Sequence, residues 1–228
     1  MPSQTYYYEE TPEATAFRRL YNKLQWQNES HGTKVFLMTS TGIGDGKSTI
    51  SAYLATASAR YRGTPTILID CDLRRPVVHK MFGLPNRHGV ADLLSQNLDL
   101  KSVLKPSAIP NLMIITAGIA NQSPADLLSS VHLKEMFNQI RFYFKIVIVD
   151  APPVLPVSDS LLLGNEADGI LFVLKAGRTQ KRMAQRAVEL LDDNRHKLLG
   201  TIINNVEGAL PYYYDHRYYK YNYYRNGQ

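Results

Sequence analysis

The first candidate for chemistry is a glycine-rich run that reads Thr41-Gly42-Ile43-Gly44-Asp45-Gly46-Lys47-Ser48-Thr49. Glycines allow backbone N–H groups to approach phosphate oxygens closely, and a following helix adds the positive end of its dipole. In this pattern the lysine reaches the β- and γ-phosphates of a nucleotide, and the serine hydroxyl is a ligand for Mg²⁺. The strict pattern has glycine where Thr41 stands, so the match is one residue short. The run predicts a site for ATP and Mg²⁺, with contacts from Gly42, Gly44, Asp45, Gly46, Lys47, Ser48 and Thr49.

Two further motifs place carboxylates at the ends of apolar runs. Asp70 and Asp72 follow the run 67–69, and Asp150 follows the run 146–149. In open α/β sheets, ligands bind at the carboxyl ends of the strands. Three carboxylates meeting there would repel one another unless a cation lay among them, and Mg²⁺ bound to ATP supplies that cation. One strand that ends in Asp can equally be a helix cap or a turn, whereas three motifs in this order favour a nucleotide site.

Tyrosine is the residue type that stands out in the composition. The chain has 15 tyrosines, and the eight candidate phosphoacceptors near its end are Tyr212, Tyr213, Tyr214, Tyr218, Tyr219, Tyr221, Tyr223 and Tyr224. No aliphatic residue follows Leu210, so this segment is predicted to be an exposed, largely disordered tail. Lys220, Arg217 and Arg225 against Asp215 give it a formal charge of +2. Each phosphotyrosine adds about −1.5 to −2, so two or three would reverse that sign.

The elements that must position these residues are predicted from apolar periodicity. Strands are expected at 35–38, 66–69, 112–116, 146–149, 170–174 and 198–203. Helices are expected at 15–27, 47–61, 124–139 and 180–192, the first with an apolar stripe of Ala16, Leu20 and Leu24. Near-continuous apolar strands that alternate with helices indicate a mainly parallel central sheet covered by helices on both faces. The predicted fold class is therefore α/β, of the P-loop NTPase type.

Length and composition limit the remaining possibilities. The 228 residues suit one α/β domain at 15–208, preceded by a flexible segment 1–14 and followed by the tyrosine tail 209–228. A single cysteine, Cys71, is typical of a reducing cytosol, and no apolar run is long enough to span a bilayer. The net charge of +6 is interpreted as solvated surface, and no specific nucleic-acid partner is expected. The basic stretch 175–186 is interpreted in the same way, with a membrane or partner surface as the alternative.

These motifs together resemble the bacterial tyrosine kinases. The sequence from Ile67 to Arg74 matches their Asp-x-Asp-x-Arg motif, and the sequence from Ile146 to Pro153 matches their second acidic strand. Residues 121–130 are similar to a Pro-Ser-Glu-Leu-Leu helix start, and residues 200–205 to the last strand, where the resemblance implies that Asn204 reads adenine. The specific combination is the Asp-x-Asp-x-Arg strand with the tyrosine tail, and the resemblance covers roughly residues 17–224.

The resemblance implies an ATP- and Mg²⁺-dependent protein-tyrosine kinase that phosphorylates its own tail, in trans between subunits. Only about 0.1% of an unperturbed tyrosine is phenolate at neutral pH, so a kinase needs a carboxylate that accepts or orients the phenol proton. The family pattern implies Asp70 as this base, Lys47 as the phosphate-binding cation, and Ser48, Asp72 and Asp150 as Mg²⁺ ligands. The choice of Asp70 over Asp72 as the base rests on the resemblance alone.

Partners are also implied by the resemblance. Family members often carry Glu-x-x-Arg-x-x-Arg in the first helix and assemble into a ring, whereas here the aligned run keeps only Arg18, so a weaker or different homo-oligomer is expected. The chain resembles the split type, whose membrane-anchored activator, of the polysaccharide co-polymerase type, is a separate polypeptide. The expected location is the cytoplasm, at the inner face of the cell membrane. The expected role is in capsule or exopolysaccharide synthesis and export, with other proteins as further substrates.

Two other functions compete with this interpretation. A partitioning or division-site ATPase of the same superfamily would share the acidic strands, but its phosphate loop carries an extra signature lysine where this chain has Gly42. It would also lack a tyrosine tail. A scaffold that binds nucleotide without transferring phosphate is the second competitor.

Overall fold

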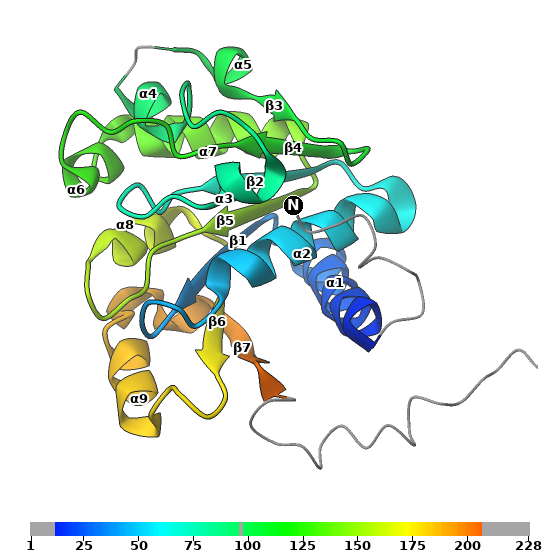
Figure 1. Ribbon diagram of the computed structural model, residues 1–228, viewed down its shortest axis with the longest axis vertical. Coiled ribbons are helices and arrows are strands. Elements are labelled where there is room, and N and C mark those ends of the chain that lie inside the picture. The colour runs from blue at the N-terminus through cyan, green and yellow to red at the C-terminus, as the bar shows by residue number, and fades with distance from the viewer. Residues whose placement is uncertain (1–11, 96–97, 207–228) are drawn as a thin grey trace, which may run out of the picture.

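A computed structural model describes residues 12–95 and 98–206 of the chain (Figure 1). The predicted tyrosine tail at 209–228 and residues 1–11 of the predicted flexible segment lie outside the described residues. Within the described part, no helix is both long and apolar enough to cross a bilayer.

One sheet organises the described residues. Its seven strands run in the order β3-β4-β2-β5-β1-β6-β7. All the pairings are parallel except that of β3 with β4, which confirms the predicted mainly parallel sheet. The six predicted strands are all present, and the short strand β3 was not predicted. The strands are β1 (Val35–Ser40), β2 (Thr66–Asp70), β3 (Lys105–Pro106), β4 (Leu112–Ile115), β5 (Ile146–Asp150), β6 (Gly169–Lys175) and β7 (Leu198–Asn204).

Helices cover both faces of this sheet, as the sequence predicted (Figure 1). The α-helices are α1 (Pro12–His31), α2 (Lys47–Arg60), α3 (Val78–Phe82), α4 (Val90–Leu94), α5 (Leu100–Val103), α6 (Pro124–Leu128), α7 (Val131–Tyr143), α8 (Asp159–Glu166) and α9 (Lys181–Glu189). Two 3₁₀ turns, η2 (Tyr61–Gly63) and η3 (Asp192–Lys197), complete the set. The single helix predicted at 124–139 is wrong, because the chain breaks between α6 and α7 at Ser129 and Ser130.

The core is divided by the sheet into two layers. Successive residues of β1 face opposite sides of the sheet, so Val35 and Leu37 join the cluster with α7, while Phe36 and Met38 join the cluster with α1 and α2. The predicted apolar stripe of α1 is partly wrong. Ala16 is exposed, whereas Ala14 and Leu24 are buried.

The parallel register places the acidic strand ends together. Asp70, at the end of β2, lies directly opposite Asp150, at the end of β5. The neighbouring strand β1 leads through the glycine-rich run into α2, which begins at Lys47. The predicted motifs therefore meet at one edge of the sheet.

Candidate nucleotide and magnesium site

The glycine-rich run forms a tight loop at the start of α2. Gly44 and Gly46 have φ angles of 85° and 96°, in the left-handed region that favours glycine. A Cβ atom on Gly46 would also overlap the side-chain amide of Asn204 on β7. That amide donates to the carbonyl of Asp45 at 2.9 Å, so a residue of β7 fixes the position of this loop. The first turn of α2 is thereby fixed where a helix N-terminus binds phosphate.

Lys47 lies among the carboxylates at the strand ends. Its Nζ is 2.8 Å from Oδ2 of Asp72 and 3.8 Å from Oδ1 of Asp150. It also donates to the Ser48 hydroxyl at 3.3 Å. Burial by itself lowers the pKa of Lys47, but the charges of Asp150 and Asp72 outweigh burial and raise the pKa above its ordinary value. The lysine is therefore held charged, as the cation that offsets these acids.

Asp70 lies beneath this cluster and is fully buried. Its Oδ1 accepts from the backbone N–H of Asp72 at 3.2 Å, and its Oδ2 accepts from the N–H groups of Val77 and Val78 at 3.2 and 3.1 Å. Burial, followed by the charge of Asp150, raises the pKa of Asp70 to about 8. Asp70 thus holds the loop that leads into α3, and it has an unusually high affinity for a proton.

Asp150 has a carboxylate oxygen that is free to bind a cation. Its Oδ1 accepts from the Ser51 hydroxyl at 3.3 Å, but its buried Oδ2 has no hydrogen-bond partner among the described residues. Burial raises the pKa of Asp150, and the charge of Lys47 opposes that shift. A buried carboxylate oxygen without a donor is a site that a metal ion satisfies. The residues therefore fit the predicted Mg²⁺.

A cavity of about 540 Å³ opens over these groups, and we call it the carboxylate cavity. Asp72 reaches it, whereas Asp70 and Asp150 lie below its lining. Among the described residues, no group of three or more His, Cys, Asp or Glu could hold a metal ion by itself. A Mg²⁺ ion bound here with ATP would take its remaining ligands from phosphates and water. The lining residues are Ile43, Gly44, Gly46, Lys47, Ser48, Thr49, Asp72, Arg74, Arg75, Val77, Pro152, Pro153, Pro156 and Val157.

An ion pair between Arg74 and Asp159 lies at the rim of this cavity, and the sequence did not identify Asp159 as the partner. The guanidinium of Arg74 donates from Nε and Nη2 to the two oxygens of Asp159, at 2.8 and 3.1 Å. Asp159 begins α8 and is fully buried. The pair ties the loop that carries Asp72 to the helix that follows β5. Nothing in the sequence marks Asp159, which lies 85 positions away from its partner.

Most of the predicted site residues are brought together. Gly44, Gly46, Ser48 and Thr49 line the carboxylate cavity beside Lys47. Gly42 and Asp45 instead line a second cavity on the other side of the loop. Ser51, which donates to Asp150, was missed, although its place one turn after Lys47 on α2 is a helical spacing that could have revealed it.

The chain resembles proteins of known type. The model of the ParA family, described as NUBPL iron-transfer P-loop NTPase, matches residues 32–224. Tyrosine-protein kinase YwqD of Bacillus subtilis (strain 168) is 36% identical over 188 residues, which cover 82% of this chain and 79% of that protein. Tyrosine-protein kinase CpsD of Streptococcus agalactiae serotype III (strain NEM316) is 31% identical over 200 residues, covering 87% and 85%. The crystal structure of the chimerical protein CapA2B2 has a TM-score of 0.81 at 28% identity and covers 87% of each chain.

Proposed function

Because the chain belongs to the bacterial tyrosine-protein kinases, within the ParA-type P-loop NTPases, we propose that it transfers the γ-phosphoryl group of ATP to tyrosines of its own C-terminal segment. The observation that carries the proposal is the position of Lys47, charged and enclosed by Asp72 and Asp150 under a cavity. The acceptors are the eight tyrosines from Tyr212 to Tyr224. The proposed domain boundaries remain 15–208 for the kinase domain and 209–228 for the tail.

The roles of the residues follow from their charges. Lys47 would leave Asp72 and bind the β- and γ-phosphates, aided by the N–H groups at the start of α2. Ser48, Asp72 and Asp150 would hold Mg²⁺, which supplies positive charge to the phosphates when it is bound. Positioning and charge stabilisation account for most of the catalysis of phosphoryl transfer, and the chain supplies both without a covalent intermediate.

The proton of the attacking phenol needs an acceptor, and we assign it to Asp70. Its pKa of about 8 supports this role, because a base is most effective when its pKa lies near the working pH. Since Asp70 lies beneath Asp72, a phenol reaches it only if residues 72–78 move. Asp72 is the alternative acceptor, because it already lines the cavity. Asp70→Asn should remove the rise of activity with pH and keep nucleotide affinity, whereas Asp72→Asn should weaken Mg²⁺-dependent nucleotide binding.

The transfer is proposed to occur in trans. A flexible tail of about 20 residues has an r.m.s. reach of about 25 Å, enough to reach a neighbouring subunit. The test mixes a Lys47→Met chain with an active chain that lacks residues 209–228. Phosphotyrosine on the tail of the Lys47→Met chain is the expected result. An unlabelled tail beside a self-labelling wild-type chain would show transfer in cis. ATP hydrolysis without any phosphotyrosine would favour a partitioning ATPase, and nucleotide binding without turnover would favour a scaffold.

A membrane-anchored adaptor of the polysaccharide co-polymerase type is the proposed partner. The support is the resemblance to the split type, together with the match to the chimerical protein CapA2B2 at a TM-score of 0.81 over 87% of each chain. We propose that the adaptor recruits the kinase to the inner face of the membrane for capsule or exopolysaccharide export. Adding the cytosolic segment of such an adaptor should raise turnover several-fold. Full activity of the chain alone, unchanged by the segment, would contradict this proposal.

A further inference from the structure

A second cavity, of about 500 Å³, lies on the other side of the phosphate loop, and we call it the arginine cavity. It is formed where the phosphate loop meets the loop after β5 and the loop between β6 and α9. No step of the proposed transfer uses it. Its lining residues are Thr41, Gly42, Ile43, Asp45, Leu155, Pro156, Arg178, Thr179, Gln180 and Met183.

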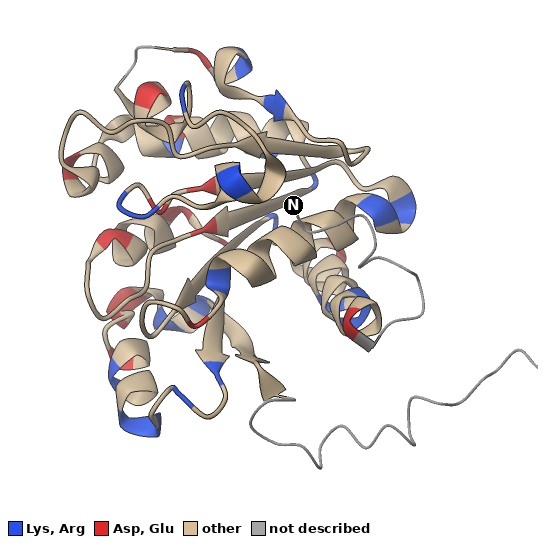
Figure 2. Ribbon diagram, viewed as in Figure 1, with Lys and Arg blue, Asp and Glu red and all other residues tan. Residues whose placement is uncertain are grey.

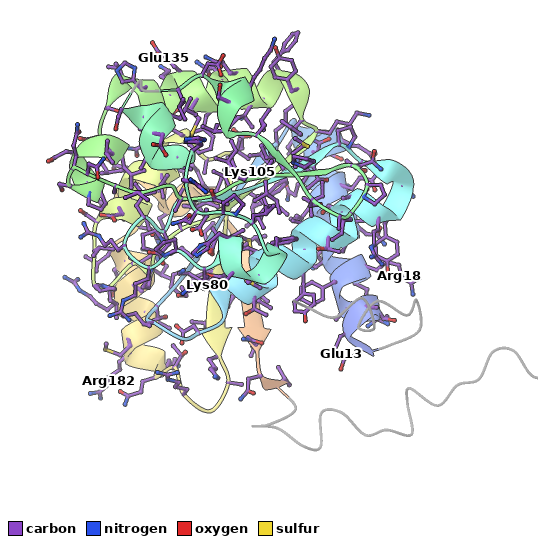
Figure 3. All side chains as sticks on the ribbon, turned by 45° about the horizontal axis from the view of Figure 1, so that its top comes forward. Glu13, Arg18, Lys80, Lys105, Glu135 and Arg182 are labelled. Atoms are coloured by element: carbon purple, nitrogen blue, oxygen red, sulfur yellow. The ribbon has the colours of Figure 1, made fainter. Side chains whose placement is uncertain are left out.

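The polar part of this cavity favours an anion. The guanidinium of Arg178 lies against the loop, so that a Cβ on Gly44 would be 2.8 Å from Nη1 of Arg178. The N-terminus of α9 borders the cavity at Gln180, and no side chain caps it. Further cations follow on the exposed surface of α9, where Figure 3 shows Arg182 extending outward and Figure 2 shows the basic colouring. A guanidinium beside an uncapped helix N-terminus is a recognised arrangement for binding phosphate.

The remaining wall of the cavity is apolar. Leu155 and Pro156 form one side, while Ile43 and Met183 are large apolar side chains left 51% and 47% exposed. Exposed apolar side chains at the edge of a concave site indicate an apolar ligand group. Thr41 also lines the cavity, and its buried hydroxyl has no hydrogen-bond partner among the described residues.

The single acid in this lining is already satisfied. Asp45 accepts from the backbone N–H of Gly42 at 2.9 Å and from the hydroxyl of Thr179 at 3.1 Å. Both carboxylate oxygens therefore have donors, so an anionic ligand group would meet Arg178 instead of an unsatisfied carboxylate. The ligand must combine an apolar body with an anionic group.

We propose that the arginine cavity binds a phosphotyrosine of the chain's own C-terminal segment. A phosphotyrosine has an aromatic ring for the apolar wall and a phosphate of about −1.5 to −2 charges for Arg178 and the α9 N-terminus. The inference rests on the proposed tyrosine phosphorylation. The unmodified segment has a formal charge of +2, from Arg217, Lys220 and Arg225 against Asp215. It therefore lacks the negative charge that would attract it to Arg178.

The path of the chain supports this occupant. The described residues end at Val206, two positions after β7. At the end of β7, the carbonyl of Asn204 accepts from the N–H of Ala176, which lies two positions before Arg178. The described part of the chain therefore ends close to the loop that supplies the guanidinium. A phosphorylated tail, repelled by the acids of the carboxylate cavity, has a basic cavity within reach.

The test measures binding of a fluorescent peptide of residues 209–228, with and without phosphate on Tyr218, to full-length chain that carries Lys47→Met and has been treated with a tyrosine phosphatase. The phosphopeptide is expected to bind about tenfold more tightly than the unmodified peptide. Saturating ATP with Mg²⁺ should leave this binding in place. Because the phosphate is installed by synthesis, the result does not depend on whether the chain is a kinase.

Variants locate the site. In the Lys47→Met background, Arg178→Ala should remove most of the preference for the phosphopeptide, and Met183→Glu should do so by adding negative charge to the apolar wall. Arg87→Ala, which alters an exposed arginine before α4, should leave it unchanged. Free inorganic phosphate should compete less well than O-phosphotyrosine. Equal affinity for the two peptides, displacement by ATP, or a preference that survives both cavity variants would overturn the proposal.

Discussion

The carboxylate cavity and the arginine cavity lie on opposite sides of one loop and share Ile43 and Pro156 in their linings, yet the charged groups around them differ. Around the first, Asp70, Asp72 and Asp150 lie beside Lys47, while Arg74 of the lining pairs with Asp159. In the second, the one acid is satisfied and Arg178 is at the mouth. The difference comes from the chain that borders each cavity, since β2 and β5 end in aspartate and the loop after β6 carries Arg178.

This difference indicates how one loop can serve two stages of a reaction. A site that must hold Mg²⁺ needs excess negative charge, and the same charge disfavours a phosphorylated product once the nucleotide has left. A neighbouring site that presents Arg178 offers the product a lower-energy position. Substitutions that alter one cavity without the other therefore test whether the two cavities serve separate stages of the reaction.

The largest expected effect is in the carboxylate cavity. Lys47→Met removes the cation that the loop offers to the phosphates, so tail phosphorylation should fall by at least about a hundredfold. The protein should stay folded, because the acids left without the lysine can bind protons instead. Phosphotyrosine blotting and circular dichroism measure the two outcomes. Lys80→Met, an exposed lysine on α3, is the matched control. Wild-type labelling by the Lys47→Met chain would place the chemistry elsewhere.

The second effect concerns the pH dependence of stability. The pKa of Asp70 rises from 3.8 to about 8 on folding, so the folded chain binds this proton more tightly than the unfolded chain. The stability from that proton is complete below about pH 4 and is lost as the pH rises through about 8. Urea unfolding of the nucleotide-free protein should show a decline of a few kcal/mol over this range.

Asp70→Asn isolates this contribution. The amide side chain does not titrate, so the decline of unfolding free energy with pH should be shallower than in the wild type, whatever constant cost the amide adds. Asp126→Asn, on the exposed surface of α6, should keep the wild-type decline. If Asp70→Asn and the wild type decline in parallel, the carboxyl does not hold the proton.

Much of the carboxylate cavity could be predicted from the sequence, because each of its motifs is a short continuous stretch of residues. A β-branched run that ends in Asp predicts both the strand and the edge of the sheet where its carboxylate lies, and Asp70 does face Asp150. The glycine-rich run likewise predicts its own loop and the start of α2. The orientation of Asp70 could not be predicted, because it depends on the N–H groups of Val77 and Val78, which only the fold brings back to it.

Features that depend on distant or competing contacts were missed. The break between α6 and α7 arises because the hydroxyls of Ser129 and Ser130 bond to the carbonyls of Asp126 and Leu127, which competes with the helical pattern. The arginine cavity has walls from three loops that are far apart in sequence, so the basic stretch 175–186 looked like ordinary solvated surface. Strands can be predicted from short apolar runs, whereas cavities formed between distant loops cannot be predicted from the sequence.

The third effect tests the rim of the carboxylate cavity. Arg74→Ala leaves the buried Asp159 without its bidentate donor, and unfolding free energy should fall by about 1–2 kcal/mol, a range reduced for the 40% exposure of the arginine side chain. Tail phosphorylation should fall several-fold, since the loop carrying Asp72 loses its tie to α8. Arg74→Lys should recover part of the stability only. A double-mutant cycle with Asp159→Asn measures the coupling, and additive effects would show that the pair contributes nothing.

The smallest effect belongs to the outer surface of the arginine cavity and compares two arginines of α9. Arg186 is 3.3 Å from Glu189, so its charge is already partly offset, whereas Arg182 lies nearer the N-terminus of the helix. Arg182→Ala should weaken phosphopeptide binding about twofold, and Arg186→Ala should weaken it less, because exposed charges act through screened, long-range attraction. The Arg182 effect should disappear at about 0.5 M salt, where the Debye length is only a few ångströms. The loss caused by Arg178→Ala should persist there, because it removes a direct contact with the phosphate. Titrations at two salt concentrations separate the two kinds of contribution, and equal salt sensitivity for Arg178 and Arg182 would place the phosphate on the surface of α9 instead of in the cavity.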